Sequence, residues 1–312
     1  MVEYDYHHLP HVKTQTKSKK ALWATLFLTL FFTAVEIIGG LISRSLALLS
    51  DSAHMASDVI ALLFSMVALY LATRPPNRKY TFGYLRFEII ASFLNGLTLA
   101  IISIWIFIEG IKRFIHPQTI DFMWMFSIAS IGLVVNIVLT IVLYRSTKAE
   151  DNLNVKSALW HFIGDLLNSA GVILSAILIY FTGMNFFDPL ISIIIGGVIF
   201  YGGAKIIRES YLILMDAVPE RFDLDRIRAD MNAIDGVEDV HEMHLWNISS
   251  DHCSLTAHIF VKQSSKPMFV ILAVNQMLKN KYGIIHTTIQ TEDPAIHYHG
   301  EYEKYGYRKN NG

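Results

Sequence analysis

Two histidine–aspartate pairs lie inside long apolar stretches of the sequence. His54 and Asp58 occur in LALLSDSAHMASD, and His161 and Asp165 occur in LWHFIGD. Each pair has the spacing His-x-x-x-Asp, so on a helix its two side chains project from one face, a turn apart. Two such pairs on two helices supply two imidazoles and two carboxylates, which is a complete tetrahedral ligand set for zinc.

The surroundings of these pairs favour a metal site over a structural role. Ionisable side chains inside a bilayer cost about 2.5–3.5 kcal/mol each on insertion scales. A single pair is explained equally well as buried polar groups that neighbouring helices satisfy. Two pairs of the same spacing favour a bound ion. Asp51 shares the face of His54, and we expect it to orient a ligand or line the ion path rather than act as a fifth ligand.

Other polar side chains lie within the apolar stretches: Glu36, Glu88, Asn95, Asn136 and Asn168. Hydrogen bonds between helices are the simpler explanation for each of them. Glu36 and Asn168 have an alternative role in lining the path of an ion. Asn168 follows His161 by seven residues and therefore projects from nearly the same face.

The apolar stretches indicate an α-helical membrane protein. Of the 312 residues, 53% are hydrophobic and only 17% are charged, which is typical of membrane proteins. A helix needs about 20 residues to cross a bilayer, and six stretches are long enough: 21–42, 46–72, 87–111, 122–144, 157–181 and 188–207. The net charge of -1 gives no indication of nucleic-acid binding, and the single cysteine, Cys253, allows no disulfide within the chain.

The basic residues predict the orientation of these six helices. They gather in the N-terminal tail and in the second and fourth loops: Lys13, Lys17, Lys19, Lys20, Arg74, Arg78, Lys79, Arg86, Arg145, Lys148 and Lys156. The opposite side has only Arg44, Lys112 and Arg113. Because cytoplasmic loops are rich in lysine and arginine, we expect a multi-pass protein of the cell membrane with both termini in the cytoplasm.

A second domain begins where the composition changes, after Tyr211. The pattern predicts helices over 221–233 and 268–282 and strands over 237–248, 254–261 and 285–292. This order indicates a small α+β module, ferredoxin-like in outline. We therefore expect a cytoplasmic N-terminal tail (1–20), a transmembrane transport domain (21–213), a cytoplasmic metal-binding domain (214–295) and a C-terminal tail (296–312).

Histidines in the second domain indicate a further metal site. A surface histidine is usually only solvated, but His241, His258 and Glu292 together form a candidate ligand set for zinc. Strand alternation predicts that His241 and His244 point to opposite faces. In the tail, three histidines form either a weak metal-capture patch or simply a solvated group: His7, His8 and His11.

The phrases SLALLSDSAHMASD, TFGYLRFE and ALWHFIGDLLNSAG resemble those of the cation diffusion facilitator family, in its zinc-transporter branch. The resemblance extends from the first span to Glu292. It implies six spans followed by a cytoplasmic metal-binding domain, homodimers, and the exchange of a divalent metal for protons. It also implies two ligand sets, His54, Asp58, His161 and Asp165 in the membrane and His241, His258 and Glu292 in the cytoplasmic domain.

The chain departs from this family pattern in two loops. Some members have histidines between the second and third helices, where this chain has Tyr80 and Tyr84, so an auxiliary site there is not expected. Eukaryotic members often have a histidine-rich loop between the fourth and fifth helices. The short loop over 145–152 lacks one, which favours a prokaryotic type.

The ligand chemistry itself predicts coupling to protons. Imidazole must be neutral and carboxylate ionised to hold zinc, so the release of the metal is linked to the uptake of protons. We therefore expect a zinc efflux transporter that exchanges Zn²⁺ for protons by alternating access, and not an enzyme.

Two other functions fit the sequence less well. An intramembrane zinc hydrolase needs an open coordination position, which four convergent ligands do not leave. A metal sensor or a structural zinc protein fits the second domain alone, but it does not explain ionisable residues within six spans.

Overall fold

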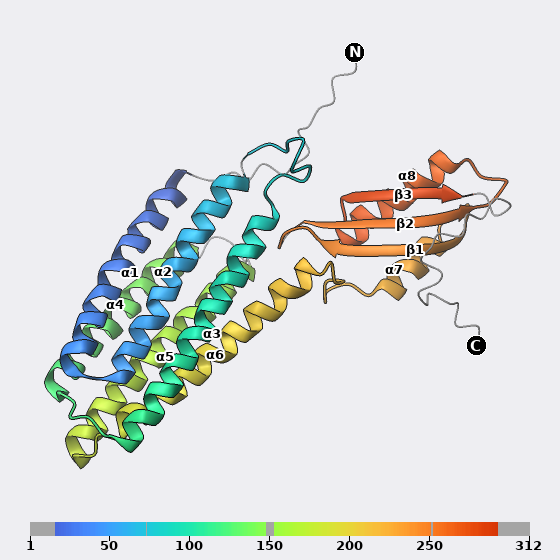
Figure 1. Ribbon diagram of the computed structural model, residues 1–312. Helices are drawn as coiled ribbons and strands as arrows, with labels where there is room; N and C mark the ends of the chain where they lie inside the picture. Colours follow the sequence, from blue (N-terminus) through green and yellow to red (C-terminus); the bar gives the residue numbers. More distant parts are fainter. Residues whose placement is uncertain (1–15, 73, 148–152, 251, 293–312) are drawn as a thin grey trace. The chain divides into compact units, whose positions relative to one another are not determined.

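The described part of the chain forms two compact units (Figure 1). The computed structural model describes residues 16–72, 74–147, 153–250 and 252–292. The helical unit comprises the residues up to 67 and residues 91–207, and the α/β unit comprises residues 68–90 and those from 208 onward. The predicted tails lie mostly or wholly outside the described residues, as do His7, His8 and His11.

Six long helices correspond to the six predicted spans and begin or end within a few residues of them. They are α1 Thr16–Ser43, α2 Leu46–Ala72, α3 Arg86–Ile115, α4 Phe122–Thr147, α5 Leu153–Thr182 and α6 Phe187–Leu214.

Four described segments are long and apolar enough to cross a membrane: Leu26–Ser43, Arg86–Ile115, Asp165–Thr182 and Phe187–Leu214. The described apolar run of α4, Phe122–Val138, is shorter. Length and composition therefore indicate a helical membrane protein, and the crossing of all six helices stays a prediction.

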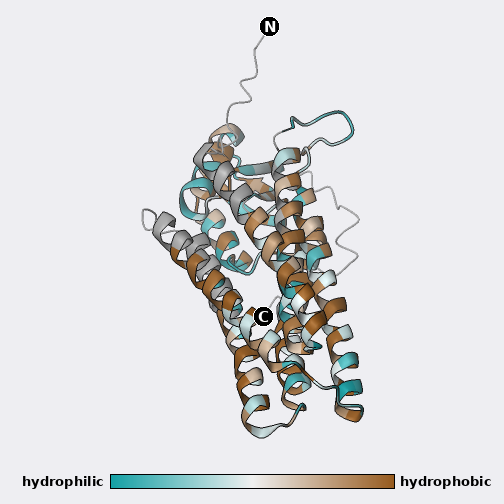
Figure 2. Ribbon diagram, turned by 90° about the vertical axis from the view of Figure 1, so that its left-hand side faces the viewer, coloured by the Kyte–Doolittle hydropathy of each residue, from teal (hydrophilic) through white to brown (hydrophobic). Residues whose placement is uncertain are grey.

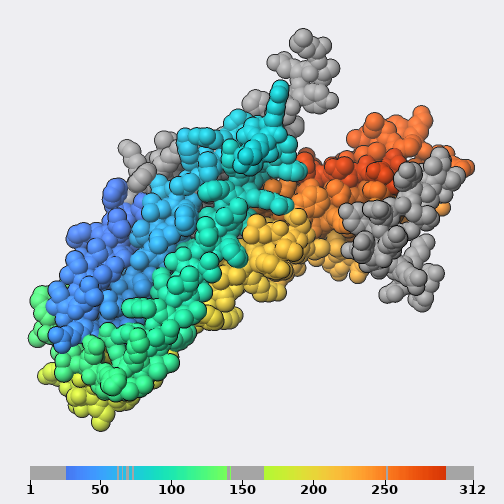
Figure 3. All heavy atoms as spheres, in the orientation of Figure 1, coloured from blue at the N-terminus to red at the C-terminus, as the bar shows by residue number. Residues whose placement is uncertain are grey.

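Apolar side chains cover the outside of the helical unit, and polar side chains lie inside it. Phe31 and Ile38 of α1 are exposed, whereas Glu36 of the same helix is fully buried. In α4, Val134 is exposed and Asn136 is buried. Figure 2 shows hydrophobic residues along the length of these helices, and Figure 3 shows the surface that α1, α2 and α3 contribute to one face. Such a distribution suits a bundle that lipid surrounds.

Glycines allow the helices of this unit to approach closely. A Cβ atom at Gly39 of α1 would lie 2.1 Å from Cδ1 of Ile128 in α4. A Cβ atom at Gly96 of α3 would lie 3.0 Å from the carbonyl oxygen of Gly203 in α6. Small residues at such crossings let backbones pack against each other without side chains between them.

A buried carboxylate from α6 fixes the start of α2. Asp188 accepts hydrogen bonds from Ser45 Oγ at 2.5 Å, from the Leu46 amide at 2.7 Å and from the Ala47 amide at 3.2 Å. Arg113 Nη1 of α3 lies 3.8 Å from the same carboxylate. The first amides of a helix have no partner within it, and a negative charge there also favours the helix dipole. Asp188 therefore positions the helix that carries His54.

The α/β unit contains the predicted order of helices and strands. Its elements are α7 Leu224–Asn232, β1 Val237–Asn247, β2 Cys253–Val261, α8 Pro267–Met277, the π-helical turn η1 Leu278–Tyr282 and β3 His286–Glu292. The sheet order is β1-β2-β3, with β1 and β2 antiparallel and β2 and β3 parallel. The likeness to a ferredoxin-like fold stays a prediction.

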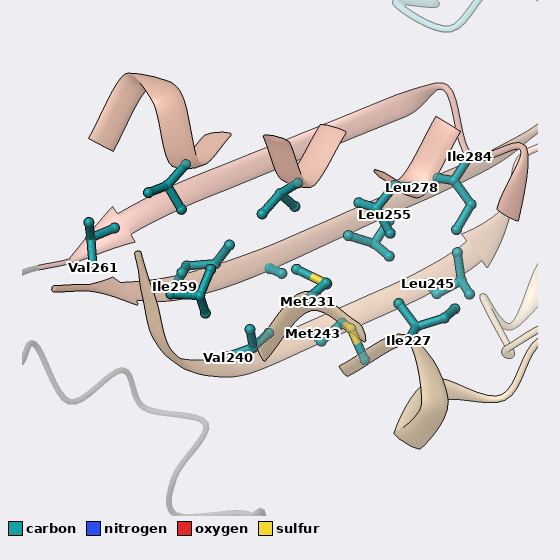
Figure 4. Close-up of a cluster of buried hydrophobic side chains, with 14 of the residues drawn as sticks. Ile227, Met231, Val240, Met243, Leu245, Leu255, Ile259, Val261, Leu278 and Ile284 are labelled. Atoms are coloured by element: carbon teal, nitrogen blue, oxygen red, sulfur yellow. The ribbon is translucent and has the colours of Figure 1, made fainter. Parts of the chain in front are cut away.

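Both helices of this unit cover the same face of the sheet (Figure 4). Ile227 and Met231 of α7, Leu255 and Ile259 of β2 and Leu278 of η1 are fully buried in one cluster. Along β2 the buried residues alternate with partly exposed ones from Leu255 to Val261. The face opposite to the helices is therefore the one on which polar side chains of the strands collect.

Candidate metal centres

Three of the four side chains predicted for the transport site converge between α2 and α5. Nε2 of His54 lies 3.2 Å from Oδ1 of Asp165 and 4.0 Å from Oδ2 of Asp58. One ligand atom from each residue lies within 4.8 Å of the others. Ligand atoms on a tetrahedral zinc ion, at bonds of about 2.0–2.1 Å, are roughly 3.3 Å apart. The 3.2 Å between His54 and Asp165 is close to that value, and the 4.0 Å between His54 and Asp58 is longer.

The helical repeat accounts for this convergence. His54 and Asp58 are one turn apart on α2, and α5 brings Asp165 against the same face. His161 lies one turn before Asp165 on α5. Its side chain is outside the described residues, so its place in the transport site stays a prediction.

The charges of the transport site favour a bound cation. The side chains of His54, Asp58 and Asp165 are only 16%, 21% and 12% exposed. Two carboxylates close together repel each other, and one imidazole supplies at most one compensating positive charge. A divalent ion can neutralise both carboxylates.

A hydrogen-bonded chain supports the transport site from inside the helical unit. Ser169 Oγ donates to Oδ2 of Asp51 at 3.0 Å, and Asn136 Nδ2 donates to Ser169 Oγ at 3.2 Å. All three residues are buried. Asp51 is thus held by α5 and α4, and its role in orienting a ligand or lining the ion path stays a prediction.

Ser169 was not predicted as part of the site, although its spacing from Asp165 was informative. Ser169 follows Asp165 by four residues and so lies on the same face of α5. The interhelical hydrogen bonds predicted for the buried amides are present for Asn136 and also for Asn95, which accepts from Ser57 Oγ at 3.0 Å. Glu88 lies in the first turn of α3 rather than deep within the helix.

A second cluster, the sheet site, consists of His241, His258 and Glu292 on three adjacent strands. Nε2 of His241 lies 3.2 Å from Oε2 of Glu292, and Nδ1 of His258 lies 2.8 Å from Oε1. One carboxylate therefore bridges two imidazoles, and the ligand atoms lie within 4.8 Å of one another. Two nitrogen donors and one oxygen donor suit zinc and leave room for a further ligand.

Strand pairing brings these three residues together. His241 pairs with His258 across β1 and β2, and Phe260, two residues after His258, pairs with Glu292 on β3. Burial raises the pKa of the Glu292 carboxyl, but the Gln290 amide and the His241 and His258 rings outweigh it, and the net effect lowers that pKa. Glu292 is accordingly ionised at neutral pH and ready to bind a cation.

A β-bulge corrects one prediction about this sheet. The register shifts between His241 and His244, and Glu242 in between has a positive φ of 44°. His241 pairs with His258 and His244 with Thr256, so the two residues between them on β1, Glu242 and Met243, stand opposite one residue of β2. The prediction that His241 and His244 point to opposite faces is wrong, because a bulge interrupts the alternation.

The bulge also adds an acidic neighbour that was not predicted. Oε2 of Glu242 lies 3.6 Å from Nδ1 of His258. Regular alternation would have sent Glu242 to the helix-covered face. Nothing in the sequence marks the bulge, since glutamate is not a residue that favours positive φ.

The two clusters, together with the fold, define a class of protein. Long apolar helices hold carboxylates and an imidazole inside the helical unit. The α/β unit has the sheet site, a second cluster of side chains of the kinds that bind metal ions. This combination is that of a membrane protein that handles divalent metal ions.

Comparison with known families identifies the family. Residues 22–215 match the cation efflux transmembrane domain, and residues 219–294 match the cation efflux protein, cytoplasmic domain. The chain belongs to the cation efflux family, and its predicted membership is confirmed.

Named relatives cover most of the chain. It is 37% identical over 288 residues to the "Cadmium, cobalt and zinc/H(+)-K(+) antiporter" of Bacillus subtilis, covering 91% of this chain and 92% of that protein. It is 36% identical over 283 residues to "Zinc transporter ZitB" of Pectobacterium atrosepticum, covering 90% and 88%. A solved metal-bound C-terminal domain of the CzcD transporter from Cupriavidus metallidurans matches with a TM-score of 0.22 and 35% identity, over 23% of this chain and 99% of that one.

Family and relatives together confirm the broad function. The protein is a membrane transporter for the efflux of divalent metal cations and not an enzyme. Its second domain is the cytoplasmic domain of cation efflux proteins.

Proposed function

We propose that this protein exports Zn²⁺ from the cytoplasm in exchange for protons. The observation that supports this most strongly is the convergence of His54 Nε2 with carboxylate oxygens of Asp58 and Asp165. With His161, which has the same spacing to Asp165, the site has four ligands. Four ligands of this type satisfy zinc fully, so the ion is carried rather than used for catalysis.

The exchange with protons follows from the same four groups. They hold Zn²⁺ only when the imidazoles are neutral and the carboxylates ionised, so protons that enter the site from outside displace the ion. Expelling a 2+ ion against an inside-negative potential costs roughly 4.6 kcal/mol per 100 mV, since each charge costs about 2.3 kcal/mol. Each returning proton offsets about half of that cost.

The sheet site serves a different purpose in this proposal. His241, His258 and Glu292 bind zinc on the cytoplasmic side, where occupancy reports the concentration of the metal. The protein acts as a homodimer through this domain. In this arrangement all six helices cross the cell membrane, both termini are cytoplasmic, and the domain boundaries lie near residues 21, 214 and 295.

Zinc flux into proteoliposomes under an imposed pH gradient tests the proposal. We expect the wild type to transport Zn²⁺ and Asp165→Asn to lose transport, at matched reconstitution. Asp121→Asn is the control, because Asp121 caps α4 at an exposed position through the Met123 and Trp124 amides and asparagine caps equally well. Near-normal flux in Asp165→Asn would contradict the four-ligand site. Parallel runs with a potassium gradient separate proton exchange from potassium exchange.

A further inference from the structure

Glu36 of α1 is a buried carboxyl group that the proposed transport cycle does not use. The residue is fully buried. Neither of its carboxylate oxygens has a hydrogen-bond partner among the described residues. It belongs to a different helix from the four proposed ligands, and no described hydrogen bond joins it to them.

The packing of α1 against α4 leaves space for this carboxyl. A Cβ atom at Gly132 of α4 would lie 2.6 Å from Oε1 of Glu36 and 3.0 Å from Cε1 of Phe32. Any other residue at position 132 would therefore displace the Glu36 side chain. The absence of a side chain at Gly132 therefore lets the buried carboxyl of Glu36 lie against α4.

The two side chains whose charges act on Glu36 are both acidic. Asp51 of α2 and Asp165 of α5 act electrostatically on Glu36. The other titratable groups of this region are His54 and Asp58, which belong to the transport site, and α4 contributes no titratable side chain over residues 122–138. An ionised carboxylate without a partner, next to other carboxylates, is strongly disfavoured, so the group takes up a proton instead.

We propose that Glu36 is a proton-binding group, separate from the metal ligands, that is protonated when the transport site is empty and ionised when Zn²⁺ occupies it. The inference rests on the proposed function, because it needs a divalent ion at the transport site. A 2+ charge nearby offsets the negative charges of Asp51 and Asp165 and so favours the ionised form of Glu36. The O–H bond of the carboxyl then breaks, the proton passes to water, and no electrons are transferred.

Counting the protons released on zinc binding tests this role. The full-length protein carries His241→Ala and His258→Ala, which remove the sheet site, and zinc is titrated by calorimetry in two buffers of different ionisation enthalpy. We expect Glu36→Gln, which fills the same space, to bind zinc but to release fewer protons per ion than its parent, by up to one. The matched control is Glu109→Gln in α3, whose carboxylate pairs with Arg113 Nε at 3.1 Å. It should release the same number of protons as the parent.

The outcomes separate this inference from the proposed function. Zinc binding with an unchanged proton count in Glu36→Gln overturns the inference alone. A parent protein that binds no zinc overturns the proposed function and the inference with it.

Infrared difference spectra of the parent cover the case in which Glu36→Gln does not fold. Adding zinc should remove the band of a protonated carboxyl, and that band should shift in Glu36→Asp. A spectrum in which zinc removes no such band overturns the inference.

Discussion

Zinc affinity at the sheet site should fall in a graded way when its residues are replaced one at a time. Glu292 touches both imidazoles, so Glu292→Gln removes an anionic ligand from a set of three. Gln290 only donates its amide to Oε1 of Glu292, at 2.8 Å. A change at such an outer partner typically costs about 10–100-fold in metal affinity, and we expect Gln290→Ala to lie near the lower end. Glu292→Gln should cost at least about 100-fold, which is about 2.8 kcal/mol at about 1.4 kcal/mol per tenfold.

The assay for this series is a competition titration with a chromophoric chelator. It uses the full-length protein with Asp58→Ala and Asp165→Ala, so that zinc is counted at the sheet site alone. Glu220→Gln is the control, since Glu220 is an exposed glutamate whose described ion pair is with Arg208, also exposed. The reasoning is refuted if Glu292→Gln binds zinc as tightly as the control, or if Gln290→Ala costs more than Glu292→Gln.

Three further changes test other parts of the structure. His54→Asp should keep zinc flux and raise the ratio of cadmium to zinc flux, because a carboxylate that binds through two oxygens lets the shell expand around a larger ion; an unchanged ratio contradicts this. Asp188→Ala should lower the free energy of unfolding by about 3–5 kcal/mol, because it leaves the Ser45, Leu46 and Ala47 donors buried without their acceptor. A melting temperature equal to that of the wild type would contradict this. The folded state lowers the pKa of Glu292. The ionised Glu292 carboxylate therefore stabilises the folded protein at pH values above the ordinary carboxyl pKa, and this stabilisation is lost as the pH falls through the lowered pKa. The melting temperature of Glu292→Gln should therefore change less with pH than that of the wild type in this acidic range. An equal change in both proteins would exclude the effect.

The parts of the structure that depend on local spacing could be predicted from the sequence. A helix places residues four apart on one face whatever its neighbours are, so the pairing of His54 with Asp58 followed from the chain alone. The helices and strands of both units begin and end near their predicted positions for the same reason. Apolar periodicity and length determine them, and both are local properties of the sequence.

The parts that depend on contacts between distant residues could not be predicted. The carboxylate of Asp188 reaches the start of α2, more than a hundred residues earlier in the chain. The bulge at Glu242 reverses the facing of His244, and it arises from how β1 pairs with β2 rather than from a turn residue. Ser169 shows the intermediate case, since its spacing from Asp165 was visible but its partner Asp51 was not.

Simultaneous recording of zinc and proton movement in proteoliposomes tests the central claim most directly. Vesicles hold a zinc indicator and a pH indicator, with no potassium and with the membrane potential clamped. We expect zinc entering through the wild type to drive protons out, and Asp165→Asn to abolish both movements together. Zinc entry without any counterflow of protons would contradict the exchange at the transport site.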